Sequence, residues 1–164
     1  GGDLGEAADK WSPEIALGMP VLIPEAYVAD LQLRLGLYRR LSSLETRADI
    51  DGFAAELVDR FGELPDEVRY RHDVMVSKRL CRAANIAKVH AGPKRAVITF
   101  RKNDFANAAG LAQFLQTERA RAKMQPDHKL VFRGDFDTAS ARIKGVRQLV
   151  ASLARIAGEA KKAA

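Results

Sequence analysis

Two acidic side chains three positions apart are the feature of this sequence best suited to binding a partner. Glu56 and Asp59 lie within an apolar repeat at helical spacing, formed by Phe53, Leu57 and Phe61. Residues three apart share one face of a helix, so both carboxylates are expected on the outer face, away from Leu57 and Phe61. Such a pair can accept charge-assisted hydrogen bonds from the arginines of a basic partner. The alternative is an ordinary solvated helix face.

No pattern typical of catalysis or cofactor binding accompanies this pair. The sequence has no phosphate-binding loop, no Gly-x-Ser-x-Gly and no dinucleotide fingerprint. The single cysteine, Cys81, follows Leu80 in a helical pattern and is expected to be a small buried residue. The three histidines are far apart and lack partners at metal-ligand spacing: His72, His90 and His128. We therefore predict no catalytic residue, no metal ligand, no cofactor-binding residue and no enzymatic activity in this chain.

The helix that carries the acidic pair is expected to end at Gly62. Glycine adopts a positive φ without a steric penalty, and it follows the last apolar residue of the repeat. Asp49 is a plausible N-terminal cap for this helix. Pro65 suits the first turn of the next helix, which is expected to run to about Ala84 and to pack His72 on or near its inner face. Asn85 can serve as its C-cap.

The remaining pattern predicts an α+β fold, a small and largely antiparallel sheet packed with about five helices. A helix is expected from Pro24 to about Ser42, with an ion pair between Asp30 and Arg34. The expected strands cover residues 15–21, 86–90, 96–101 and 130–133, and the second and third of them are expected to form a β-hairpin around the turn at residues 92–94. The other expected elements are a helix capped by Asn103 or Asn107, and a last helix that starts at Asp137 or Thr138 and has Ile143, Val146, Val150, Leu153 and Ile156 inward. Residues 1–12 are expected to be a linker or an expression remnant, and residues 13–164 the folded domain.

The net charge of the chain is compatible with a nucleic-acid partner. The chain of 164 residues carries a formal net charge of +6. Basic clusters occur at Lys78-Arg79, residues 119–123, residues 142–147 and Lys161-Lys162. One continuous basic stripe on the folded surface would favour binding to a phosphate backbone, whereas dispersed lysines would indicate solubility alone. Aromatic residues make up 7%, which argues against a base-stacking platform. No apolar run approaches a membrane span and no signal peptide is visible, so a cytoplasmic location is expected.

Two motifs together resemble the C-terminal domain of the bacterial transcription-repair coupling factors. The resemblance runs from about Glu14 to near the C-terminus. The motifs are Ile23-Pro24-x-x-Tyr27-x-x-Asp30-x-x-x-Arg34-Leu35-x-x-Tyr38-Arg39-Arg40-Leu41 and Asp59-Arg60-Phe61-Gly62-x-Leu64-Pro65. The resemblance implies a parent protein that is an ATP-driven DNA translocase using ATP and Mg, which removes stalled RNA polymerase and recruits excision-repair proteins. It also implies that RNA polymerase and DNA are contacted by other domains of that parent.

The resemblance further implies a regulatory role for this domain. In the family, the domain docks onto an amino-terminal, repair-factor-like module of the same protein and masks the surface that recruits the UvrA component of the excinuclease. Glu56 and Asp59 match acidic positions of the family motif that face arginines of that module. The expected function is therefore autoinhibition through protein–protein contacts, and an accessory nucleic-acid-binding module is the alternative.

Overall fold

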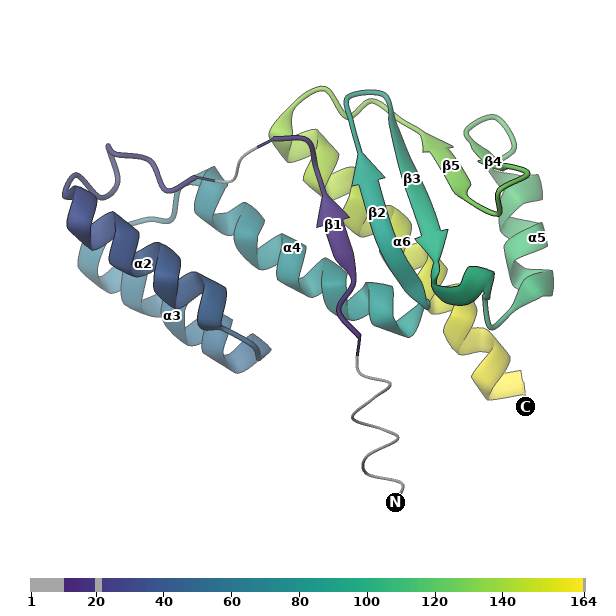
Figure 1. Cartoon of the computed structure of the whole chain (residues 1–164), viewed down its shortest axis with the longest axis horizontal. Coiled ribbons are helices and arrows are strands. Elements are labelled where there is room, and N and C mark those ends of the chain that lie inside the picture. Colours follow the sequence, from purple (N-terminus) through teal and green to yellow (C-terminus); the bar gives the residue numbers. More distant parts are fainter. Residues whose placement is uncertain (1–10, 20–21, 164) are drawn as a thin grey trace, which may run out of the picture. The chain divides into compact units, whose positions relative to one another are not determined.

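The computed structural model describes residues 11–19 and 22–163, which form two compact units. The sheet unit lies within residues 1–18 and 77–164, and the helical unit comprises residues 19–76. In chain order the elements are β1 (Glu14–Ala16), α2 (Leu31–Ser43), α3 (Arg47–Phe61), α4 (Asp66–Ala83), β2 (Ile86–Ala91), β3 (Arg95–Phe100), a 3₁₀ turn (Arg101–Asn103), α5 (Ala108–Thr117), β4 (Ala122–Met124), β5 (Leu130–Arg133) and α6 (Ala139–Ala163) (Figure 1).

Within the described residues the sheet has five strands, in the order β1-β2-β3-β5-β4. β1 runs parallel to β2, and the other three pairings are antiparallel. With five α-helices in the described part of the chain, this confirms the predicted α+β class and the largely antiparallel sheet. The hairpin β2–β3 was predicted from the sequence. Strand β4 was not, because its three residues lie in a polar and basic stretch without an apolar alternation.

One face of the sheet is buried against α6. Val89, Ile98 and Leu130 have no exposed surface, and α6 supplies the five inward residues that its spacing predicted. At the end of β5, the buried Arg142 of α6 donates to the carbonyl oxygens of Phe136 and Leu17. The guanidinium therefore takes the place of backbone N–H donors for these two carbonyl groups. Arg142 is thus not available for phosphate contact, which removes it from the basic cluster at residues 142–147.

The helical unit begins differently from the sequence prediction. Pro24 opens a turn, in which its carbonyl accepts from the amides of Tyr27 and Val28, and α2 starts only at Leu31. Asp30 is the N-cap, because its carboxylate accepts the amide of Leu33 at 2.8 Å. The predicted ion pair of Asp30 with Arg34 is therefore wrong. Arg34 instead donates to the carbonyls of Val28 and Ala29.

Some of the other helix caps were predicted correctly. Thr46, not Asp49, caps α3 by accepting the amide of Asp49 at 3.0 Å. Asn107 caps α5, and its amide also donates to the carbonyl of Ile156 on α6 at 3.0 Å. Asn85 ends α4 at a φ of 58°, as expected of a C-cap. Residues 1–10 of the predicted linker, residues 20–21 of the predicted first strand, and the Lys161-Lys162 side chains lie outside the described part of the chain.

Gly62 ends α3 as predicted, at φ 94° and ψ −166°. This extended conformation at positive φ is populated almost only by glycine. No atom lies within 4 Å of a Cβ built at Gly62, so the constraint comes from the backbone and not from crowding. The structure thus requires glycine at this position for a local conformational reason.

We expect Gly62→Val to destabilise the protein by about 1–3 kcal/mol, because valine must adopt this backbone conformation. The matched control is Gly52→Val, in the interior of the same helix, where a Cβ also meets nothing within 4 Å. That change should be neutral or slightly stabilising, because valine exceeds glycine in helix propensity. Urea denaturation of both variants measures the difference. Equal midpoints for the two variants would contradict the assignment.

Candidate protein-interaction site

Helix α3 positions the two acidic residues. Its inner face buries Ile50, Phe53 and Leu57, of which Leu57 has no exposed surface. Because Glu56 is rotated by about 100° from Leu57 and Asp59 by about 160°, Glu56 lies at the edge of the buried stripe and Asp59 on the outer side. The two residues are therefore near neighbours in different surroundings.

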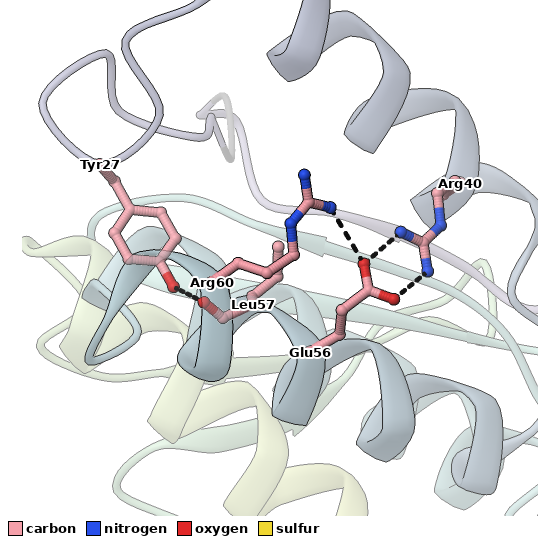
Figure 2. Close-up of polar contacts among 5 residues, drawn as sticks. All are labelled: Tyr27, Arg40, Glu56, Leu57 and Arg60. Atoms are coloured by element: carbon pink, nitrogen blue, oxygen red, sulfur yellow. Dashed lines mark hydrogen bonds and ion pairs between the residues drawn. The ribbon is translucent and has the colours of Figure 1, made fainter.

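Glu56 is held by two arginines of the same unit (Figure 2). Arg40 on α2 approaches it with both terminal nitrogens, Nη1 at 2.5 Å from Oε2 and Nη2 at 3.0 Å from Oε1. Arg60, one turn further along α3, donates to Oε2 at 3.3 Å. The side chain of Glu56 nevertheless remains 38% exposed. Its carboxylate is thus paired within the domain and still open to solvent on one side.

This pairing lowers the pKa of Glu56. The hydrogen bond from Arg40 is the largest cause, and the charges of Arg40 and Arg60 act in the same direction, while partial burial opposes them. Arg40 correspondingly has a raised pKa, chiefly because it donates to Glu56. Arg40 also lies over the ring of Phe53, 4.7 Å from its centroid. The three charged side chains together carry one net positive charge.

Asp59 is exposed, and it forms no ion pair with any residue in the described ranges. Its neighbour Arg60 is directed to Glu56 and to the ring of Phe61, 4.9 Å from the centroid. In the sequence, the three-residue spacing gave no reason to distinguish Glu56 from Asp59. Of these two acids, Asp59 is the one whose carboxylate is uncompensated in the structure.

The two sequence motifs meet at the end of α3. The hydroxyl of Tyr27 is 3.1 Å from the carbonyl of Leu57, near the end of the helix, and 2.9 Å from that of Gly62, which follows it (Figure 2 shows the first contact). Its ring contacts Phe61 at a centroid distance of 5.8 Å. Burial raises the pKa of Tyr27, so the hydroxyl stays protonated as the donor. Sequence reasoning missed this contact because it joins residues 35 positions apart.

The other candidate residues do not assemble a reactive centre. His72 was expected to be a packed histidine, but its Nε2 lies 2.9 Å from Asp51 and its side chain is 33% exposed. Cys81 is buried as predicted, and burial raises the pKa of its thiol to about 12. No three histidine, cysteine or acidic side chains in the described ranges come together in a way that could bind a metal ion. Nor does any helix there have the length and apolarity needed to cross a membrane.

Comparisons with known proteins agree with the resemblance carried by the motifs. The family described as the TRCF domain matches residues 17–111. The transcription-repair-coupling factor of Rickettsia bellii is 43% identical over 121 residues, which are 73% of this chain and 11% of that protein. The Escherichia coli protein of the same name is 31% identical over 140 residues, 85% of this chain and 12% of that protein.

A solved structure supports the fold independently. A crystal structure of the C-terminal domain of transcription-repair coupling factor superposes with a TM-score of 0.68 at 22% identity, covering 92% of this chain and 96% of that one. The chain spans about a tenth of the length of the relatives it matches. From the family match over residues 17–111 together with these relatives, the chain belongs to the transcription-repair coupling factor family.

Proposed function

We propose that this domain regulates its parent protein by docking, through the acidic side of α3, onto the amino-terminal repair-factor-like module of the same chain. Docking would mask the surface of that module that recruits the UvrA component of the excinuclease. The observation that carries this proposal is the exposed and uncompensated carboxylate of Asp59, one turn from the half-exposed Glu56. In this proposal the domain itself has no catalytic role and needs no cofactor, and contacts with ATP, Mg, DNA and RNA polymerase belong to other domains of the parent.

The two acids would have separate roles in docking. Asp59 meets an incoming arginine without first breaking any contact within its domain. Glu56 can engage the partner only with its remaining lone pairs, or by exchanging Arg40 or Arg60 for an arginine of the module. Since a carboxylate accepts bonds from more than one donor, a shared arrangement is chemically reasonable. Arg40 is therefore expected to compete with the partner for Glu56.

A closed state held by a few such contacts can be opened. Charge-assisted contacts at an interface mainly set the dissociation rate, and losing one of them shifts the population from closed to open. Because the contacts lie within one polypeptide, a high local concentration would compensate for modest intrinsic affinity. Weak charge complementarity on α3 is thus sufficient for autoinhibition. A competing partner can then relieve it.

We expect Asp59→Asn to weaken binding of this chain to the separately expressed amino-terminal module by about tenfold or more. Glu56→Gln should also weaken it, whereas Arg40→Gln should strengthen it by releasing the carboxylate of Glu56. Isothermal titration calorimetry measures all three. Asp49→Asn, another exposed acid near the start of α3, is the charge-matched control and should change nothing. If Asp49→Asn and Asp59→Asn weakened binding equally, the effect would come from net charge alone, which would contradict the proposed site.

We further expect Glu56 to titrate below its ordinary value of 4.5, and its pKa to rise in Arg40→Gln because the main hydrogen bond is lost. A carboxylate whose pKa is lowered on folding contributes stability that is fully present above its unfolded-state pKa. That contribution is lost as the pH falls through the folded-state pKa. The difference in stability between the wild type and Glu56→Gln should therefore be present at neutral pH and vanish in acid. Carboxyl NMR titration and acid denaturation measure both effects. An unchanged Glu56 titration in Arg40→Gln would show that the pair does not form in solution.

A further inference from the structure

The second face of the sheet carries lysine and arginine side chains among apolar and polar ones. On each strand, alternate residues point away from α6, which lies behind β2 and β3 in Figure 1. Their neighbours Val89, Ile98 and Leu130 are fully buried on the helix side. The residues of the outer face are Glu14, Ala16, Lys88, His90, Arg95, Val97, Thr99, Lys123, Val131 and Arg133, all half-buried or exposed.

The strand register brings these residues together from the five strands. Arg95 on β3 is directly opposite Arg133 on β5. In the neighbouring row, Val97 is opposite Val131, and Val131 is opposite Lys123 on β4. The result is a patch with two small apolar side chains at its centre and cations on adjacent positions.

The cations of this patch are largely uncompensated. Arg95, Lys123 and Arg133 are exposed and form no ion pair with any residue that the structure describes. Glu14, the carboxylate that β1 adds to this face, lies 3.7 Å from both Lys88 and His90. Asp135, two positions after Arg133, lines a hollow with Lys144 and Gln148 of α6 and so lies toward the other face.

The direct cross-strand pairing of Arg95 with Arg133 lowers the stability of the sheet. Like charges directly across an antiparallel pair repel each other and destabilise it. An anion bound between them would relieve this repulsion, and a guanidinium pair suits the oxygens of a phosphate. The register of the strands therefore favours a polyanion on this face.

The composition of the face favours nucleic acid over an acidic protein. Protein interfaces are enriched in aromatic residues and depleted of lysine at their centre, and this face has the opposite composition. Protein–DNA interfaces are more polar and more positive. Without an aromatic residue on the described strands of this face, bases of a single strand cannot stack there. We infer that the outer face of the sheet binds the phosphate backbone of duplex DNA, independently of base sequence and of the docking site on α3.

Fluorescence anisotropy of this chain with a labelled duplex of mixed sequence tests the inference. If Arg95, Lys123 and Arg133 each contact one phosphate, they contribute about −2.7 to the slope of log affinity against log salt. Affinity should then fall at least about 40-fold between about 50 and 200 mM salt. The triple variant Arg95→Gln/Lys123→Gln/Arg133→Gln should bind more weakly at low salt and have a slope flatter by about 2.7.

The control removes the same charge from exposed positions of the unit that are not on the strands. Lys144→Gln and Arg155→Gln on α6, with Arg119→Gln after α5, change three exposed cations. This control should retain the binding and the salt slope of the wild type. If both triple variants lose binding equally, the effect is one of net charge, and the sheet face is not a site. No binding by the wild type at low salt, tighter binding of a single strand, or more effective competition by polyglutamate than by unlabelled duplex would each overturn the inference.

A single charge reversal separates binding from folding. Arg95→Glu places opposite charges across the β3–β5 pair, so its thermal midpoint should equal or exceed that of the wild type. The same change should weaken duplex binding more than Arg95→Gln does. A lower midpoint together with lost binding would indicate damage to the sheet and would count against the role of Arg95.

Discussion

The end of helix α3 is the constraint on which the candidate docking site depends. Gly62 stops the helix in a backbone conformation that other residues rarely adopt, and the single hydroxyl proton of Tyr27 lies within hydrogen-bond reach of the carbonyls of Leu57 and Gly62. Together these contacts fix where the last turn of α3 ends and how the chain before α2 lies against it. The positions of Glu56, Asp59 and Arg60 follow from that arrangement.

The charges on α3 are arranged unevenly. Arg40 and Arg60 surround Glu56, and Asp59 is left to solvent. A pair that looks acidic in the sequence is therefore a compensated carboxylate beside a free one. An exposed ion pair contributes little to stability, so the Arg40 contact can be exchanged for an intermolecular one without unfolding the domain. Such exchange is what a reversible autoinhibitory contact requires.

Local patterns in the sequence predicted the parts of the fold that depend on local physics. The apolar spacing of α6, the glycine at the end of α3 and the β2–β3 hairpin were correct because each depends on neighbouring residues. The start of α2 was wrong because proline at position 24 suits a turn as well as a first helical turn, and the Asp30 cap decided between them. The pairing of Glu56 with Arg40 and the alignment of Arg95 with Arg133 join distant segments, so no local pattern could reveal them.

Affinity of the full-length parent protein for the UvrA component of the excinuclease tests the central claim most directly. The comparison is between the wild type and a variant in which Asp59 is changed to lysine, at equal and verified folding stability of the domain. If α3 docks on the amino-terminal module, the reversed charge opens the closed state, and affinity for UvrA rises toward that of the parent without this domain. An unchanged affinity for Asp59→Lys, with a clear rise on removing the domain, would place the docking surface elsewhere.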